Sequence, residues 1–256
     1  MKPVSIDKEL CIGCGKCVRD CVSEKLQIID GKAEFLSERC IQCGHCYAIC
    51  PVNAVTMTKY PDYEGEKVTD VTSISSDSLL AVMKSRRTIR KFTDKRISAD
   101  EIAKIIEAGR YCPTGTNAQD FHFTVLRDSV DEIERECVKL FRSSLKVASP
   151  IKKYIGNITV DDHFFFKGST AVIVVSSKGT TSACLASSYM ELMAATMGIG
   201  VLYSGFFVAA SKLSPKVKKL LGLPKGLSPV TCLVLGYPDV EYERIPPRNA
   251  PEISYK

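Results

Sequence analysis

From Asp77 onward, apolar residues recur at the spacings of amphipathic helices and of short buried strands. Ser98 followed by Glu101 is a capping box, which predicts a helix that continues to about Gly109. Unbroken apolar runs such as 170–176 predict buried strands. The pattern predicts helices capped at Asp77 and Ser98 and others at 130–145, 182–197 and 215–221, with strands at 121–126, 170–176 and 230–235. This order of elements is typical of a domain with a central sheet flanked by helices.

The first 58 residues lack this periodicity and contain two cysteine-rich runs instead. Short strands are expected at 28–29 and 55–57. Residues 59–76 are polar and are broken by Pro61 and Gly65, so they are predicted to be a linker. The expected organisation is a small domain at 1–58, a linker at 59–76 and a larger domain at 77–256. A chain of 256 residues has room for both domains.

The two cysteine runs share the spacing C-x2-C-x2-C-x3-C and start 29 residues apart. In this spacing the first three thiolates bind one [4Fe–4S] cluster, and the fourth cysteine binds the other cluster. The spacing therefore assigns one cluster to Cys11, Cys14, Cys17 and Cys50, and a second cluster to Cys40, Cys43, Cys46 and Cys21. A zinc site is less consistent with four cysteines inside eleven residues, twice. A disulfide framework is disfavoured because residues 1–10 contain no export signal.

The two runs resemble a bacterial two-cluster ferredoxin over roughly the first 58 residues. Val22 stands where ferredoxins often have proline after the fourth cysteine, which removes a rigid turn but leaves the ligand in place. Few apolar residues remain once the ligands are set aside. The clusters are therefore expected to supply much of the core of this domain.

Composition and charge narrow the possible partners. The chain is 45% apolar and 25% charged, with a formal net charge of +6 that thiolate ligands and clusters would reduce. No run of five or six Lys or Arg residues is present, so we do not expect nucleic-acid binding. The most apolar window, 183–202, contains Glu191 and is too interrupted to span a membrane, so it predicts a buried helix or a subunit interface. Reduced cysteines and oxygen-sensitive clusters favour a cytoplasmic location.

Four separated segments of the larger domain point to one ligand, although each is weak alone. Arg86, Arg87, Thr88 and Arg90 gather three cations and a hydroxyl suited to a phosphate. The loop 113–117 has small residues that could approach a planar ring, and 198–205 has little side-chain bulk, which is also typical of close helix packing. Arg248 follows two prolines near the C-terminus.

Taken together and in this order, the segments resemble the nitroreductase family of FMN enzymes over about residues 77–250. The basic motif is matched by 86–90, the Pro-Ser-small-x-Asn-x-Gln loop by 113–119, and the glycine-ended flavin loop by 202–205. The resemblance implies a homodimer with FMN at the interface. It implies FMN contacts from the basic motif (Arg86, Arg87, Thr88, Arg90), from the loop of the second subunit (Pro113, Thr114, Gly115, Asn117), from one side of the ring (Leu202, Tyr203, Ser204, Gly205) and from Arg248.

The sequence departs from the commonest family pattern in two places. Asp120-Phe121 follows Gln119 where the family often has Pro-Trp, and Ser204 stands where some relatives carry an acidic residue. Both departures change the expected shape of the substrate pocket. The thiols of Cys112, Cys137, Cys184 and Cys232 are predicted to be small buried groups, and Glu191 is predicted to be hydrogen-bonded at a packed interface.

The expected fold class is α+β, with a ferredoxin-like two-cluster module followed by a nitroreductase-like domain. The expected enzyme is an FMN-dependent oxidoreductase that passes electrons from a low-potential donor, such as ferredoxin, through two clusters to FMN and on to a nitro compound, a quinone or a similar small molecule. No G-x-G-x-x-G motif indicates a dinucleotide domain. Two alternatives stay open: a non-catalytic electron carrier or redox sensor that serves a protein partner, and a flavin reduced directly by NAD(P)H. No catalytic side chain is identified.

Overall fold

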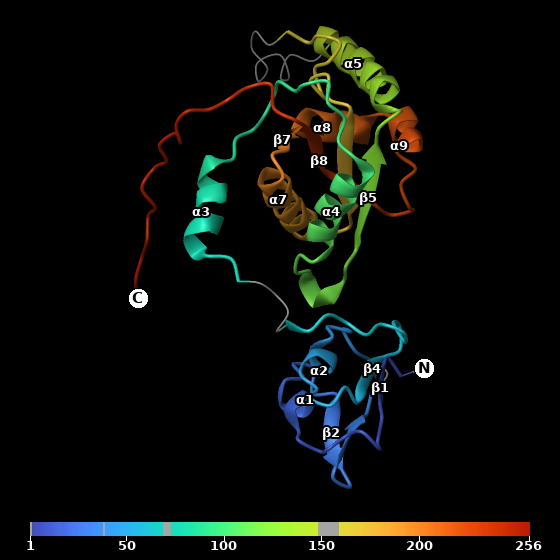
Figure 1. Cartoon of the computed structure of the whole chain (residues 1–256). Coiled ribbons are helices and arrows are strands. Elements are labelled where there is room, and N and C mark those ends of the chain that lie inside the picture. Colours follow the sequence, from blue (N-terminus) through green and yellow to red (C-terminus); the bar gives the residue numbers. More distant parts are fainter. Residues whose placement is uncertain (1, 38, 69–72, 148–158) are drawn as a thin grey trace. The chain divides into compact units, whose positions relative to one another are not determined.

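The computed structural model describes residues 2–37, 39–68, 73–147 and 159–256 (Figure 1). The chain forms two compact units. Unit 1 comprises Met1–Ser73 together with Thr114–Ala118, and unit 2 comprises Ile74–Pro113 and Gln119–Lys256. Each unit is described separately below.

Unit 1 is built from two short antiparallel strand pairs and two single-turn helices. β1 (Val4–Ile6) pairs with β4 (Val55–Met57), and β2 (Leu26–Ile29) forms a hairpin with β3 (Lys32–Phe35). α1 (Lys16–Arg19) and α2 (His45–Ala48) each follow a left-handed glycine, Gly15 and Gly44. The two helices occupy matching places in the two cysteine runs, so the internal repeat of the sequence is also a repeat of local structure.

One glycine of the first cysteine run is required by a close approach between backbones. Gly13 has a φ of +68°, and a Cβ on it would lie 2.0 Å from the carbonyl oxygen of Gly31 at the tip of the hairpin. Gln42 occupies the same position in the second run with a φ of 51°. Both runs therefore use the same left-handed turn, and in the first run the missing side chain of Gly13 leaves room for the backbone of the hairpin.

Unit 2 contains a four-stranded antiparallel sheet with the strand order β5-β6-β8-β7. The strands are β5 (Phe121–Leu126), β6 (Ala171–Ser177), β7 (Gly200–Tyr203) and β8 (Ser228–Gly236). All seven residues of β6 are buried, because helices cover both faces of the sheet. The parallel bridge between Thr88 and Val201 extends the sheet beyond β7.

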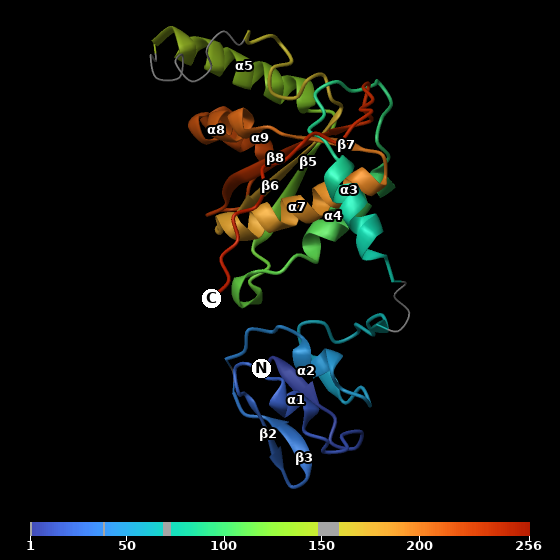
Figure 2. The same cartoon turned by 90° about the vertical axis from the view of Figure 1, so that its left-hand side faces the viewer.

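The helices of unit 2 form one layer on each face of the sheet (Figure 2). α4 (Ala99–Arg110) and α7 (Thr180–Thr196) pack on one face, and α5 (Val130–Val147), α8 (Gly205–Leu213) and α9 (Pro215–Leu221) cover the other. Alternate residues of β6 enter the two cores: Ile173 faces α4 and α7, whereas Val174 faces the opposite layer. α3 (Ser76–Ser85) precedes the basic segment, and a single 3₁₀ turn covers Gly115–Asn117.

Most predicted elements are present, with several differences, including the strands β1 and β3, which the sequence pattern did not indicate. The cap of the first helix is Ser75 rather than Asp77, because the Ser75 hydroxyl accepts the Ser78 N–H at 3.1 Å. Residues 200–203 form a strand, and 205–213 form a helix that the pattern did not indicate. Cys184 is exposed rather than buried, whereas Cys112, Cys137 and Cys232 are buried as expected.

The capping box is confirmed: the Ser98 hydroxyl accepts the Glu101 N–H, and the Glu101 carboxylate accepts the Ser98 N–H. None of the helices in the described parts of the chain combines the length and apolar character that a membrane crossing requires.

Candidate functional site

Unit 1 contains two cavities, and each is lined by four cysteines. Cys11, Cys14, Cys17 and Cys50 line the first, and Cys21, Cys40, Cys43 and Cys46 line the second. Each cavity takes three cysteines from one sequence run and the fourth from the other. These are the two groups of four that the spacing predicts, including the exchange of the fourth cysteine.

The thiols surround each cavity without converging on one point. In the described residues no three His, Cys, Asp or Glu side chains are placed to hold a single metal ion. A [4Fe–4S] cluster does not need convergent ligands, because each of its four irons takes its own thiolate. A ring of four cysteines around a cavity therefore fits a cubane cluster better than a zinc ion.

Backbone N–H groups point at sulfur in both cavities. The Ala33 N–H donates to Cys11 Sγ at 3.4 Å and the Ala54 N–H donates to Cys50 Sγ at 3.2 Å. In the second cavity the Gln42 N–H donates to Cys40 Sγ at 3.3 Å and the Lys25 N–H donates to Cys21 Sγ at 3.4 Å. Such bonds stabilise the charge of a thiolate, so the chain is arranged to carry negative sulfur at both places.

The acidity of the thiols differs with their surroundings. Burial raises the pKa of Cys11, but hydrogen bonds from Ala33 and Gly13 and the charges of Lys32 and Lys8 outweigh it, so the net pKa is lowered. Burial raises the pKa of Cys17, and it raises the pKa of Cys46 to about 11. Buried thiols of this kind become thiolates readily only when a metal takes the place of the proton.

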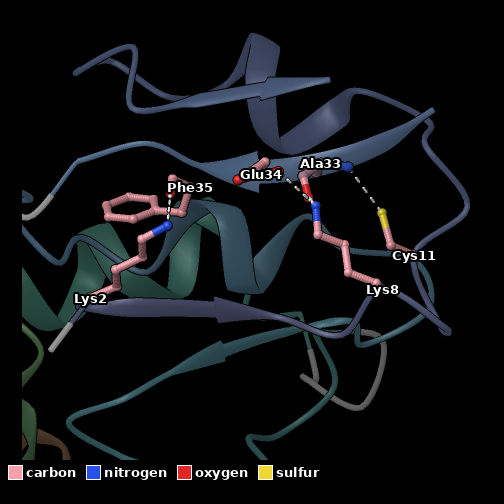
Figure 3. A network of polar contacts seen from close by, with 6 residues as sticks. All are labelled: Lys2, Lys8, Cys11, Ala33, Glu34 and Phe35. Carbon is pink, nitrogen blue, oxygen red and sulfur yellow. Dashed lines mark hydrogen bonds and ion pairs between the residues drawn. The ribbon is translucent and has the colours of Figure 1, made fainter. Parts of the chain in front are cut away.

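Lysines hold the β3 strand beside the first cavity (Figure 3). Lys8 Nζ donates to the Ala33 carbonyl at 3.0 Å and pairs with Glu34 at 3.2 Å, while the Ala33 N–H donates to Cys11 (Figure 3). Lys2 Nζ donates to the Phe35 carbonyl at 2.9 Å. The hairpin that supplies hydrogen bonds to sulfur is thus fixed by charged side chains from the β1 segment.

In unit 2 the structure brings together two of the four segments predicted to bind one ligand. The Ile89 N–H donates to the Val201 carbonyl at 3.1 Å, which places the basic segment 86–90 beside β7. Gly200 allows this approach, because a Cβ on it would lie 2.5 Å from the Ile89 side chain. A cavity of about 240 Å³ adjoins the two segments, and its lining includes Arg86, Arg87, Glu191, Gly198 and Tyr242.

Arg86 is the centre of a charged network that sequence reasoning missed. Its Nη1 lies 2.7 Å from Glu191 Oε1 on α7, and Glu191 also shares a hydrogen bond with Tyr203. Burial raises the pKa of Glu191, and the Arg86 charge limits this rise; burial also raises the pKa of Tyr203. The only sequence signal was an acidic residue inside an apolar helix. Arg86 keeps further guanidinium donors beyond the one that Glu191 accepts.

The other predicted residues lie in two further places. Arg248 belongs to the exposed C-terminal segment. Pro113 closes one stretch of unit 2, whereas Thr114–Ala118 group with unit 1, where Asn117 Nδ2 donates to the Gln42 carbonyl at 2.7 Å. Thr116 and Asn117 have positive φ values of 52° and 54°, a strained conformation that is frequent at functional loops.

The comparisons with known proteins agree with this geometry. Residues 83–237 match the nitroreductase family model, and residues 4–57 match the 4Fe-4S dicluster domain. The chain belongs to the nitroreductase family.

Individual relatives resemble one part of the chain or the other. A protein of Archaeoglobus fulgidus, named as an NADH dehydrogenase/NAD(P)H nitroreductase, is 27% identical over 166 residues, which cover 64% of this chain and 88% of that protein. A ferredoxin of Pyrobaculum islandicum is 39% identical over 54 residues, 21% of this chain and 50% of that protein. An FMN-bound nitroreductase structure from Bacteroides fragilis has a TM-score of 0.58 at 23% identity, and the match covers 69% of this chain and 98% of that one.

The family, the α+β class and the order of the two domains expected from the sequence are therefore confirmed. The expectation of an FMN-dependent oxidoreductase with iron–sulfur clusters is confirmed at the level of the family and of the dicluster domain. The individual ligand residues and the exact domain limits stay predictions.

Proposed function

We propose that this chain is an oxidoreductase that moves electrons through two [4Fe–4S] clusters to FMN and on to an electron-poor small organic compound, such as a nitro compound or a quinone. The observation that carries the proposal is the pair of four-cysteine cavities in a chain whose other domain is a nitroreductase. Clusters accept one electron at a time, whereas a flavin can collect two and deliver them as a hydride.

In this proposal the residues of the chain bind and position the cofactors. Cys11, Cys14, Cys17 and Cys50 bind one cluster, and Cys21, Cys40, Cys43 and Cys46 bind the other. Arg86, Thr88 and Arg90, with Arg248, hold the FMN phosphate and ring edge, while Arg87 supports the same segment. Residues 202–205 line one side of the flavin. Pro113, Thr114, Gly115 and Asn117 contribute from a second subunit.

The donor is either a reduced ferredoxin or NAD(P)H. Relatives named as an NADH dehydrogenase/NAD(P)H nitroreductase and as an NADPH-dependent oxidoreductase favour the nicotinamide. The two cysteine cavities of unit 1 favour a one-electron protein donor, because a hydride donor can reduce a flavin without clusters. We propose the ferredoxin route as the one that uses the whole chain. A reducing compartment such as the cytoplasm suits oxygen-sensitive clusters.

A homodimer is supported by the surface of α7. Leu185 is 37% exposed and Tyr189 is 44% exposed on this helix, next to the exposed Cys184. α3 likewise presents Leu80 at 45% and Met83 at 43% exposure. Apolar side chains gathered on two helices are typical of a surface that another subunit covers.

We propose the domain limits that the sequence predicts: the clusters in 1–58, a linker at 59–76 and the FMN domain in 77–256.

A cysteine exchange tests the electron route. Cys21→Ser removes the fourth thiolate of the second cavity, so turnover of a nitroaromatic compound driven by reduced ferredoxin should fall by at least tenfold. Reduction of the same compound should persist when dithionite reduces the flavin directly. Ser5→Ala, a change of an exposed residue of β1 that lines neither cysteine cavity, is the control and should leave both rates unchanged. Full ferredoxin-driven turnover in Cys21→Ser, with its cluster absent, would show that the second cluster is not on the route.

A further inference from the structure

The two cysteine cavities match in sequence spacing and in hydrogen bonding to sulfur, but not in charge. Backbone N–H groups donate to sulfur in both cavities, at 3.2 and 3.4 Å in the first cavity and at 3.3 and 3.4 Å in the second. Hydrogen bonds to sulfur therefore do not distinguish the two cluster sites. Nearby cations do.

Two cationic side chains are anchored on the backbone of the first cavity's cysteines. Lys32 Nζ donates to the carbonyl of Cys11, and Arg19 Nη1 donates to the carbonyl of Cys14 at 3.3 Å. Among the described residues no carboxylate pairs with Lys32 or Arg19 at ion-pair distance. Lys8 also lies in this region (Figure 3), but Glu34 partly offsets its charge at 3.2 Å.

The second cavity lacks these contacts. In the part of the chain that the structure describes, no Lys or Arg side chain donates to the carbonyl of Cys21, Cys40, Cys43 or Cys46. The repeat position that holds Lys16 in the first run holds His45 in the second, and His45 Nδ1 lies 3.1 Å from Asp20 Oδ2. Lys25 contacts Cys21 through its main-chain N–H. Lys2 Nζ donates to the carbonyl of Phe35, which lines the second cavity, and not to the carbonyl of one of its four cysteines.

A cluster gains one negative charge when it accepts an electron, and a nearby fixed cation stabilises that charge. We propose that the cluster bound by Cys11, Cys14, Cys17 and Cys50 has the higher reduction potential, and that Lys32 and Arg19 set the difference. This inference rests on the proposed cluster ligands. The exchange is one electron from the reduced cluster of the second cavity to the oxidised cluster of the first, with no bond made or broken and no proton moved. A single electron in unit 1 therefore resides at the first cavity.

The test is an anaerobic equilibrium redox titration of the full-length holoprotein, followed by electron paramagnetic resonance at low temperature. Wild-type protein should show two midpoints. Lys32→Gln should lower only the higher midpoint, by a three- to tenfold change in the reduction equilibrium, which is about 30–60 mV for a one-electron couple. Lys32→Arg should restore the wild-type value. Arg19→Gln should shift the same midpoint in the same direction, which keeps the test valid if Lys32→Gln loses a cluster.

Lys2→Gln is the charge-matched control and should leave the higher midpoint unchanged. A shift of the lower midpoint in Lys32→Gln, or no shift in either Lys32→Gln or Arg19→Gln while both clusters are present, would overturn the inference alone. Wild-type protein without about eight irons per chain after anaerobic purification would instead overturn the proposed cluster ligands, and this inference with them.

Discussion

The cores of units 1 and 2 differ in what fills them. Unit 2 buries large side chains such as Phe207 and Ile105 between a sheet and two helical layers. Unit 1 buries few large side chains, notably Leu26 and Phe35, and its remaining interior is two cavities bounded by thiols. A segment of about 60 residues rarely builds a sufficient apolar core by itself. The difference indicates that unit 2 is stabilised by its own packing, whereas unit 1 is stabilised by what its cysteines bind.

The strongest way to break this comparison is to remove iron. Anaerobic treatment with an oxidant and a chelator should unfold unit 1 and leave unit 2 folded, because cluster binding is a large part of the folding free energy of unit 1. Hydrogen exchange read by mass spectrometry should show loss of protection across 26–35 and retention across β6. Equal protection of the β2–β3 hairpin before and after iron removal would show that unit 1 does not depend on its clusters.

Shortening a buried side chain of unit 2 should destabilise unit 2 and leave the clusters of unit 1 in place. Phe207 is 0% exposed, so Phe207→Ala should lower the free energy of unfolding of unit 2 by about 3–5 kcal/mol. Leu213→Ala, on the same helix but at a residue that is 69% exposed, should change it by about 0.5 kcal/mol or less. Urea unfolding followed by circular dichroism measures both, and iron content should stay constant. If Phe207→Ala also lost iron, unit 1 would depend on the packing of unit 2, which would contradict the comparison.

The cofactor of unit 2 should depend on charge rather than on core packing. In the proposed FMN site, Arg86→Ala would remove a charge-assisted hydrogen bond to phosphate worth about 1.5–3 kcal/mol, so the FMN dissociation constant should rise about tenfold to a hundredfold. Lys84→Ala, which removes an equal charge two residues earlier, in the last turn of α3, is the control. Fluorescence titration with FMN measures both variants. Equal affinity in Arg86→Ala and wild type would place the phosphate elsewhere.

The smallest expected effect concerns the cap of α4. Ser98→Ala should lower the free energy of unfolding by about 1 kcal/mol. Hydrogen bonds from Tyr237 and Ser98 lower the pKa of Glu101 to about 2 in the folded chain. The stabilisation from Glu101 is therefore complete above its unfolded pKa and is lost as the pH falls toward 2. Glu101→Gln should flatten this part of the stability profile, measured by thermal unfolding between pH 2 and 6; an unchanged profile would contradict the assignment.

The parts that could be predicted from sequence are those with a local signal. The spacing of the cysteines indicated both four-cysteine groups, because in this spacing the fourth cysteine of each run is typically shared with the other run. The capping box at Ser98 and the apolar run of β6 were equally local.

The missed parts depend on distant contacts. β7 is a strand because it pairs with the distant β8, and Gly200 leaves room for the Ile89 side chain beside it; α8 begins two residues after β7 ends. β3 was missed because only two of its four residues, Ala33 and Phe35, are apolar and buried, and the charged Lys32 and Glu34 alternate with them. The pairing of Arg86 with Glu191 joins residues 105 positions apart, and no short motif indicates it.

The order in which the cofactors are reduced tests the proposed electron route most directly. Anaerobic stopped-flow mixing of oxidised full-length protein with reduced ferredoxin separates the visible bands of the clusters from those of the flavin. The clusters should bleach first, and the flavin should follow at a rate independent of donor concentration, because its electrons arrive from within the chain. Flavin reduction that precedes cluster bleaching, at a rate proportional to donor concentration, would contradict the route from clusters to FMN.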